Sequence, residues 1–400
     1  MGIKNLKKFI REVFPDLIKK VHISEFSNEK IAVDTSSYMY SYKAVFGDTW
    51  LNAFPNLIYT LKKWDVHGNF MLDGKAPKEK DKERAKRGEQ KEKLEDNVMN
   101  LSLELDLYKS SQQSTPFLVE IMAKINKSNV KTQKVTRMLH AGKKESDPEY
   151  IDVDAIEEYL KKKEKQIINF SPDDIKDLKK MLELFGVPYT QAPGEAEALG
   201  AYMSSVGKVK AVLTEDTDVL AYGTSIYLSD LDSSSGYCEA IYLSEVLEAF
   251  EYTLDEFLDF CIMCGTDYND NIPGYACKTA FEFINKNRCI ETFIEEDTKE
   301  RRRRRDIKSK TKKKILKCEE EIDYTILNHN RSRELFKTFG DLEKGEQYNS
   351  TFWDTNIDFD RLYDFLRTKK CRYVPSVIEE YWKEPEIIFD DEEEEIVIQE

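Results

Sequence analysis

The chain has 400 residues, of which 40% are apolar and 34% are charged, and its formal net charge at pH 7 is −15. A chain of this length and composition can bury a large core and still expose an extensive charged surface. No apolar stretch approaches the ~18 residues of a membrane span, which excludes a membrane-embedded class. Residues 1–20 carry apolar side chains at helical spacing instead of a signal peptide's continuous apolar block, so we expect an intracellular protein.

Three short apolar runs along the chain each lead into an aspartate. They are residues 31–33, 70–72 and 211–213, followed by Asp34, Asp73 and Asp216 respectively. Continuous apolar runs are typical of strands buried on both faces, as in parallel sheets. Because parallel sheets bind ligands at the carboxyl ends of their strands, these aspartates mark the expected site.

Predicted helices separate these runs. Residues 171–185 begin with Ser-Pro-Asp-Asp, which supplies an N-cap, a proline at the first helical position and acids that favour the helix dipole. Residues 253–265 begin with Thr-Leu-Asp-Glu, a capping-box pattern, and end near Gly265. The alternation of strands and helices predicts an α/β fold with a mainly parallel sheet.

Four further carboxylates are candidates for the same site. Asp218 lies two residues after Asp216, Glu195 and Glu197 have the same spacing, and Asp267 follows a predicted helix end. Two like charges ~4 Å apart repel by about 4 kcal/mol at an effective dielectric near 20. The acids therefore either lie apart on the surface or hold metal ions. Oxygen ligands without His or Cys favour Mg²⁺ or Mn²⁺ over zinc.

The Glu195 and Glu197 side chains would point about 200° apart on a regular helix. Their convergence therefore requires Glu195 to stand in the irregular stretch that the preceding Pro193 and Gly194 indicate.

Charge is distributed unevenly along the chain. Residues 384–400 hold nine acids and no base, which is typical of a disordered tail, so the net charge does not exclude a nucleic-acid partner. Residues 299–317 are strongly basic and indicate a phosphate-binding patch, a nuclear import signal or a solvated loop. Residues 75–93 are also basic, a pattern shared with helical surfaces that carry i,i+4 ion pairs.

Six motifs resemble the flap endonuclease branch of the structure-specific 5′ nuclease family. In chain order they are MGIKNLKKFI, AVDTSSYMY, MLDGKAPKEKDKERAKR, VPYTQAPGEAEAL, VLTEDTDVLAYG and CGTDYNDNIPGYACKTA. The resemblance covers residues 1 to about 290 and continues more weakly to about 383. It implies a central mixed, mainly parallel sheet flanked by helices, a helical arch and a helix-two-turn-helix module.

The resemblance also implies a division of the chain. The nuclease core would span residues 1–383, with an enlarged arch insertion at 74–170, the helix-two-turn-helix region at 253–290 and a C-terminal helical part at 291–383 that carries the basic run. Residues 384–400 would form the acidic disordered tail.

Two Mg²⁺ ions, with Mn²⁺ able to substitute, are implied at the carboxylates. The implied ligands are Asp34, Asp73, Glu195 and Glu197 in a first group and Asp216, Asp218 and Asp267 in a second. Asp34 and Asp216 would act in catalysis together with Lys80 and Arg87, which match the basic pair that reaches the scissile phosphate.

Further residues match the family's DNA contacts. Tyr40 corresponds to the aromatic residue that stacks on a base, and Gly2 to an N-terminus packed near the site. The remaining expected contacts, besides Lys80 and Arg87, are Gly274 and Lys278 in the hairpin and Arg301, Arg302 and Arg303 in the basic run.

The hairpin of the helix-two-turn-helix region departs from the family pattern Gly-x-Gly-Pro-Lys. Ala276 and Cys277 replace its second glycine and its proline. This departure puts in doubt the bound K⁺ ion and the binding of the downstream duplex that the family's hairpin provides. The C-terminal region also lacks the peptide that commonly recruits a sliding clamp.

The implied function is cleavage of branched DNA by a monomeric, metal-dependent 5′-flap endonuclease with 5′ exonuclease activity, acting in DNA repair and replication. The products would carry a 5′-phosphate and a 3′-hydroxyl. One alternative is a 5′-to-3′ exoribonuclease, whose acidic motifs read differently from PGEAEAL and TEDTDVL. Another is an inactive junction-binding scaffold, which would be expected to have lost one of the acids. The basic run leaves a nuclear location open beside a cytoplasmic one.

Overall fold

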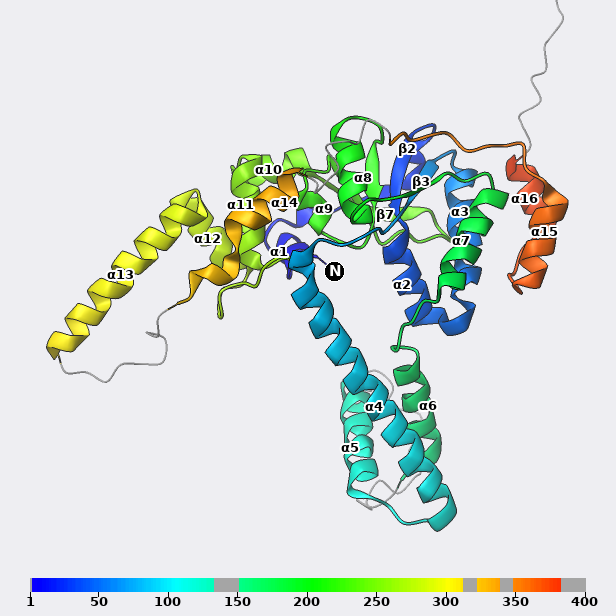
Figure 1. Cartoon of the computed structure of the whole chain (residues 1–400), viewed down its shortest axis with the longest axis horizontal. Coiled ribbons are helices and arrows are strands. Elements are labelled where there is room, and N and C mark those ends of the chain that lie inside the picture. The colour runs from blue at the N-terminus through cyan, green and yellow to red at the C-terminus, as the bar shows by residue number, and fades with distance from the viewer. Residues whose placement is uncertain (1, 133–150, 312–321, 339–347, 383–400) are drawn as a thin grey trace, which may run out of the picture.

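A seven-stranded mixed sheet forms the centre of the molecule (Figure 1). The computed structural model describes residues 2–132, 151–311, 322–338 and 348–382. The strand order is β1-β7-β6-β5-β2-β3-β4. The strands are β1 (Lys19–His22), β2 (Lys30–Asp34), β3 (His67–Leu72), β4 (Tyr189–Gln191), β5 (Ala211–Leu213), β6 (Ile226–Ser229) and β7 (Tyr237–Tyr242).

The five strands from β6 to β4 pair in parallel, whereas β7 and β1 pair antiparallel at one edge. The prediction of a mainly parallel sheet is therefore confirmed. The three apolar runs lie in β2, β3 and β5, which are neighbours in the sheet. Their carboxyl ends consequently meet at one edge.

Helices cover both faces of this sheet. The helices of the body include α1 (Leu6–Val13), α2 (Thr35–Phe46), α3 (Phe54–Lys63), α7 (Pro172–Leu184), α8 (Ala196–Ser205), α9 (Asp218–Ala221), α10 (Leu243–Phe250) and α11 (Leu254–Cys264). Helices α12 (Cys277–Asn287), α15 (Phe359–Thr368) and α16 (Pro375–Trp382) pack outside these layers, on α11, α7 and α3 respectively. Alternate residues of β2 point to opposite sides, as expected for a strand. Ala32 belongs to the apolar cluster that includes residues of α1, α8 and α11, whereas Ile31 and Val33 belong to the cluster that includes residues of α2, α3 and α7.

The two helix starts predicted from capping patterns are confirmed. Ser171 is the N-cap of α7 and forms a capping box with Asp174. Thr253 is the N-cap of α11 and forms the same motif with Glu256, and α11 ends at Cys264 before Gly265.

One glycine, Gly200, lets helix α8 pack directly against the sheet. A Cβ atom at Gly200 would stand 3.2 Å from the Ala32 Cβ and 3.2 Å from a Val212 methyl, on β2 and β5. This close approach brings the start of α8 to the edge where those strands end.

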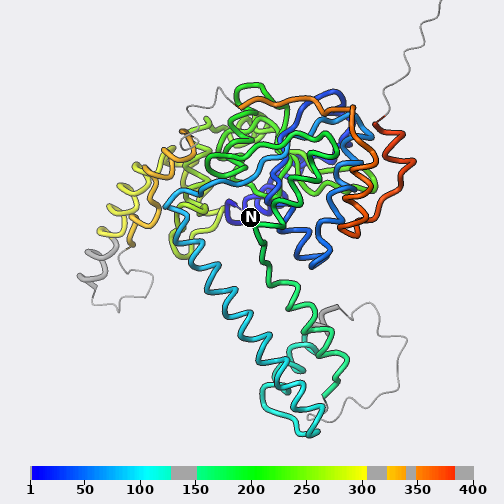
Figure 2. The backbone as a smooth tube through the Cα atoms, turned by 45° about the vertical axis from the view of Figure 1, so that its right-hand side comes forward, coloured from blue at the N-terminus to red at the C-terminus, as the bar shows by residue number. Residues whose placement is uncertain are grey.

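Three helices project away from the sheet as a separate unit, which we call the arch bundle (Figures 1 and 2). They are α4 (Asp81–Ser111), α5 (Pro116–Thr132) and α6 (Val153–Glu164). The far end of α4 packs with the other two around its own apolar cluster, distinct from the two clusters on the sheet. The cluster consists of Leu101, Leu105, Leu118, Ile121, Met122, Ile125, Ile151 and Ile156.

The remaining helices are α13 (Ile290–Thr311), which extends away from the body in Figure 1, and α14 (His329–Thr338). Residues 299–311 of the basic run are thus helical, which contradicts a solvated loop there. The predicted acidic tail at 384–400 lies outside the described residues. No helix in the described ranges combines the length and apolar character needed to cross a membrane.

Replacing Leu118 by alanine tests the independence of the arch bundle. Leu118 is fully buried in the bundle's cluster, and such a truncation costs about 2 to 5 kcal/mol. We expect faster amide hydrogen exchange in α4, α5 and α6 and unchanged exchange in the central strands. Leu103→Ala, at a side chain that is 57% exposed on α4 of the same bundle, is the matched control and should change exchange in neither the bundle nor the sheet. Equal acceleration in bundle and sheet would contradict two separate cores.

Candidate functional site

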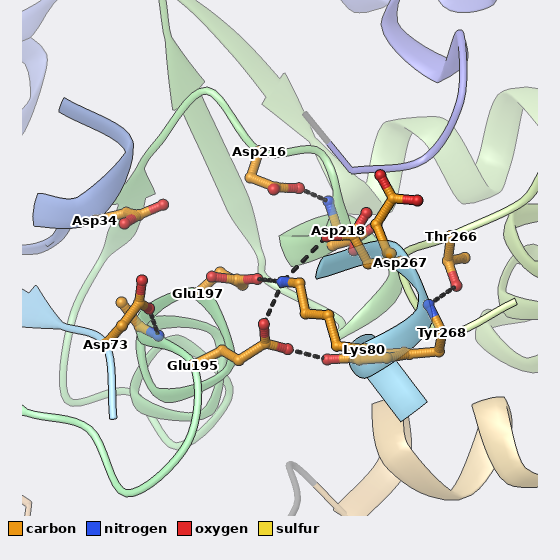
Figure 3. Close-up of polar contacts among 12 residues, drawn as sticks. Asp34, Asp73, Lys80, Glu195, Glu197, Asp216, Asp218, Thr266, Asp267 and Tyr268 are labelled. Carbon is orange, nitrogen blue, oxygen red and sulfur yellow. Dashed lines mark hydrogen bonds and ion pairs between the residues drawn. The ribbon is translucent and has the colours of Figure 1, made fainter. Parts of the chain in front are cut away.

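Seven carboxylates from separate elements gather at the carboxyl edge of the sheet (Figure 3). They are Asp34 at the end of β2, Asp73 after β3, Glu195 and Glu197 at the start of α8, Asp216 and Asp218 after β5, and Asp267 after α11. The structure thus brings together every acid that the sequence singled out. These side chains come from positions up to 233 residues apart (267 − 34).

The backbone at Glu195 explains how two acids two residues apart reach the same site. Glu195 is the N-cap of α8 and has extended backbone angles, φ −86° and ψ 144°. Glu197 lies within the first turn of the helix. Asp73 supports this start by accepting a hydrogen bond of 2.8 Å from the Ala196 N–H. The predicted irregular backbone at Glu195 is therefore confirmed.

Burial makes the negative charge of this cluster costly. Asp34, Glu197, Asp216 and Asp218 are each less than a tenth exposed. Burial raises the pKa of Asp34 to about 7, and repulsion by Asp73 adds to the shift. Burial also raises the pKa values of Glu197, Asp216 and Asp218, with repulsion from neighbouring carboxylates acting in the same direction. These acids need positive charge beside them to stay ionised together.

Lys80 supplies such a charge from within the cluster. Its Nζ contacts Glu195, lies 3.0 Å from Asp267 Oδ2 and lies 3.5 Å from Glu197 Oε1. Burial alone would lower the pKa of Lys80, but the three surrounding carboxylates raise it. The ammonium group therefore remains charged and holds the carboxylates around itself (Figure 3).

Arg87 joins the same group of charges. Its guanidinium donates two hydrogen bonds to Asp267, at 3.1 and 3.0 Å. Burial would raise the pKa of Asp267, but Lys80 and Arg87 together lower it. Lys80 immediately precedes α4 and Arg87 lies in its second turn, so the base of the arch bundle is ion-paired to the carboxylates.

The donor set fits a hard divalent cation. Asp218 Oδ1 is buried and has no hydrogen-bond partner in the described part of the chain, and all seven acids offer only carboxylate oxygens. As the side chains stand, no three His, Cys, Asp or Glu residues of the described ranges are arranged to hold a metal ion. Lys80 lies among the carboxylates instead, so a cation bound there would have to displace its ammonium group.

Among the expected DNA contacts, Lys80 and Arg87 pair with the carboxylates and Gly2 packs against Asp216, whereas Tyr40 and the hairpin residues lie outside the cluster. Tyr40 is 49% exposed on α2, and its ring packs edge-on against Phe170 at 5.3 Å. Gly274 and Lys278 are exposed at the hairpin before and within α12. Ala276 has φ −103° and ψ 176°, an extended conformation that does not require glycine.

Arginines 301–303 of the basic run are of two kinds. Arg301 donates to Asp297 at 2.7 Å and to the Tyr275 hydroxyl at 2.9 Å, so it ties α13 to the hairpin. Arg302 and Arg303 are exposed on the same helix.

Tyr268 was missed by the sequence reasoning. Its hydroxyl donates a hydrogen bond to Glu195 Oε2. The available signal was its position directly after Asp267, but a tyrosine in a loop is too common to single out.

Two family models match parts of the chain, and known nucleases are similar to it. Residues 1–94 match the family model of the XPG N-terminal domain, and residues 186–267 match that of the XPG I-region. A probable RAD2-like endonuclease of Invertebrate iridescent virus 6 is 30% identical over 389 residues, covering 91% of this chain and 86% of that relative. Flap endonuclease 1 of Aedes aegypti is 31% identical over 316 residues, covering 75% of this chain and 70% of that relative.

Two solved structures share the fold. The catalytic core of Rad2 in complex with a DNA substrate has a TM-score of 0.59 at 15% identity, with 95% of this chain and 99% of that chain covered. Flap endonuclease-1 from Methanococcus jannaschii has a TM-score of 0.51 at 20% identity, with 92% and 96% covered.

Gly2→Ala tests how tightly the N-terminus packs on the cluster. An added Cβ would lie 2.0 Å from Asp216 Oδ1 and 2.7 Å from the Asp218 nitrogen, and Gly2 has φ +80°. We expect the N-terminal segment to be displaced. Hydrogen exchange should then accelerate at the Lys4 N–H, which donates to the Gly265 carbonyl at 3.0 Å.

Gly207→Ala is the matched control for this substitution. Gly207 has a similar φ of +72° but no atom within 4 Å of an added Cβ. This variant should lose only about 1 to 2 kcal/mol of folding stability, which is the cost of backbone strain. Hydrogen exchange at the Lys4 N–H should stay unchanged. Identical behaviour of the two variants would contradict close packing of Gly2 on Asp216.

Proposed function

Because the chain belongs to the flap endonuclease branch of the XPG/FEN1 family and is a nuclease, we propose that it cleaves branched DNA at 5′ flaps in a reaction that depends on divalent metal ions. The observation that carries this proposal is the convergence of all seven carboxylates with Lys80 and Arg87 at one edge of the sheet. We further propose 5′ exonuclease activity at the same site.

The seven acids would hold two Mg²⁺ ions, with Mn²⁺ able to replace them. Bound there, such ions lower the pKa of a water and stabilise the departing 3′ oxygen, which leaves a 5′-phosphate and a 3′-hydroxyl. The buried carboxylates would then no longer need the Lys80 ammonium as their counter-charge. Lys80 and Arg87 would be free to contact the scissile phosphate from the base of the arch bundle.

Further DNA contacts are proposed on either side of this site. Tyr40, exposed on α2, would stack on a base near the cleaved bond, and Gly2 would keep the N-terminus packed beside Asp216. Gly274 and Lys278 would face the downstream duplex. A monomeric state and a nuclear or cytoplasmic location stay predictions. A K⁺ ion at the altered hairpin and recruitment by a sliding clamp are not proposed, because Ala276 and Cys277 replace the family's residues and no clamp peptide is recognised.

Asp216→Asn tests the metal-dependent reaction. The carboxamide fills the same space but lacks the charge that offsets a cation, so we expect turnover on a labelled 5′ flap in Mg²⁺ to fall at least ~10²-fold. Binding of the flap should change little. Asp364→Asn, at a carboxylate 73% exposed on α15, is the control and should cleave normally. Normal turnover by a folded Asp216→Asn protein would refute the proposal.

The same assay separates the alternative functions. Flap, nick, gap and Holliday-junction DNA and 5′-monophosphate RNA would be compared under one set of conditions. Preference for the RNA would indicate a 5′-to-3′ exoribonuclease. Tight binding to junctions without any cleavage would indicate an inactive scaffold.

The exposed part of the basic run is proposed to contact duplex phosphates. Each neutralised phosphate adds ~0.9 to the slope of log affinity against log salt concentration. Replacing Arg302 and Arg303 together by glutamine should therefore flatten this slope by about 2, with turnover at saturating substrate nearly unchanged. Arg367→Gln, at an exposed arginine on α15, should leave the slope as it is. An unchanged slope in the double variant would exclude the duplex contact and leave a nuclear import signal or a solvated surface without a binding role.

A further inference from the structure

Glu195 is held by two different groups, one on each carboxylate oxygen. Lys80 contacts Oε1, and the Tyr268 hydroxyl donates a hydrogen bond to Oε2. The Tyr268 hydroxyl also shares a hydrogen bond with the hydroxyl of Tyr222. The two tyrosines and the glutamate therefore form a continuous chain of hydrogen bonds, which we call the tyrosine relay.

The relay is buried and joins three separate elements. Tyr222, Tyr268 and Glu195 are 5%, 6% and 6% exposed, so water does not readily replace a lost hydrogen bond. Tyr222 follows α9, which begins at the site residue Asp218. Tyr268 directly follows Asp267, and Glu195 caps α8.

Helix α14 closes the relay from outside. The ring of Phe336 lies 4.7 Å from that of Tyr222 and 5.1 Å from that of Tyr268. Phe336 is itself 1% exposed. Arg333, one turn earlier on α14, fixes the helix by donating two hydrogen bonds of 2.6 Å to Asp259 on α11. Phe336 therefore packs against both tyrosine rings and restricts their reorientation.

Glu195 has a particular need for such support. It precedes the helix, and its side chain makes no capping hydrogen bond to the backbone of α8. The Lys80 contact on Oε1 is the one that a cation bound at the carboxylates would replace, whereas the Tyr268 contact on Oε2 can persist. Partners of this kind, which orient a metal-binding side chain from behind, typically contribute 10- to 100-fold in metal affinity.

We propose that Tyr268 is a positioning residue that presents Glu195 Oε1 to a divalent cation, and that Tyr222 acts through Tyr268 by fixing the direction of its hydroxyl. The inference rests on the proposed metal-binding role of the carboxylates and deepens it. It assigns a function to two residues that make no contact with the substrate in the proposed reaction.

The test is a titration of the full-length protein with Mn²⁺, without DNA, followed by electron paramagnetic resonance of the free ion. Tyr268→Phe should raise the apparent dissociation constant about 10-fold, and Tyr222→Phe should raise it by a smaller factor. The double variant should resemble Tyr268→Phe alone, because Tyr222 acts only through Tyr268.

Tyr59→Phe is the matched control. The Tyr59 hydroxyl is buried without a hydrogen-bond partner in the described residues, and its ring packs against Phe185 and Trp382 away from the carboxylates. This variant should bind Mn²⁺ like the wild type. Thermal unfolding of every variant separates loss of stability from loss of metal affinity in the folded protein. If Tyr268→Phe does not fold, Tyr222→Phe still tests the relay.

The Mn²⁺ titrations distinguish failure of the positioning role, of the relay and of the metal-dependent function. Unchanged Mn²⁺ affinity in folded Tyr268→Phe would overturn the positioning role. Effects of the two substitutions that simply add would overturn the relay, since they would act independently. Absence of Mn²⁺ binding by the wild type would instead overturn the metal-dependent function itself.

Discussion

Repulsion among buried carboxylates is the constraint around which this site is organised. Asp34, Glu197, Asp216 and Asp218 are nearly inaccessible to water, and burial raises the pKa of each. Removing the screening solvent makes every like-charged pair more costly. The acids can stay ionised together only beside positive charge. Lys80 provides that charge by placing its ammonium group among three of the acids.

This balance of charge couples the site to the arch bundle. Lys80 and Arg87 stand at the base of α4, and both pair with Asp267. In the proposed reaction, bound cations would neutralise the carboxylates and the same two basic side chains would turn to the phosphate. The position of the bundle's base and the occupancy of the metal site would then be linked through electrostatics alone, without a change in the sheet.

Close backbone packing and the cover of α14 keep the acids in place. Gly200 allows α8 to approach β2 and β5, and Gly2 allows the N-terminal backbone to approach Asp216. Helix α14, held by Arg333 on Asp259, covers Tyr222 and Tyr268 with Phe336. The part of the chain after α13 thus contributes to the environment of Glu195 although it holds none of the carboxylates.

The amino-acid sequence by itself determined the features that depend on neighbouring residues. Apolar runs indicated that strands end at Asp34 and before Asp73. Capping residues indicated the starts of α7 and α11, and helical geometry required extended backbone at Glu195. Each of these signals acts over only a few positions. The family motifs added the assignment of the acids to one group. Only the tertiary structure decided that Lys80 lies between Glu195 and Asp267, that Arg301 is engaged by Asp297 and Tyr275, and that Tyr222 reaches Glu195 through Tyr268. Lys80 and Glu195 are 115 residues apart, and no local pattern encodes such a contact, because it arises from how strands, helices and the base of the arch pack against one another.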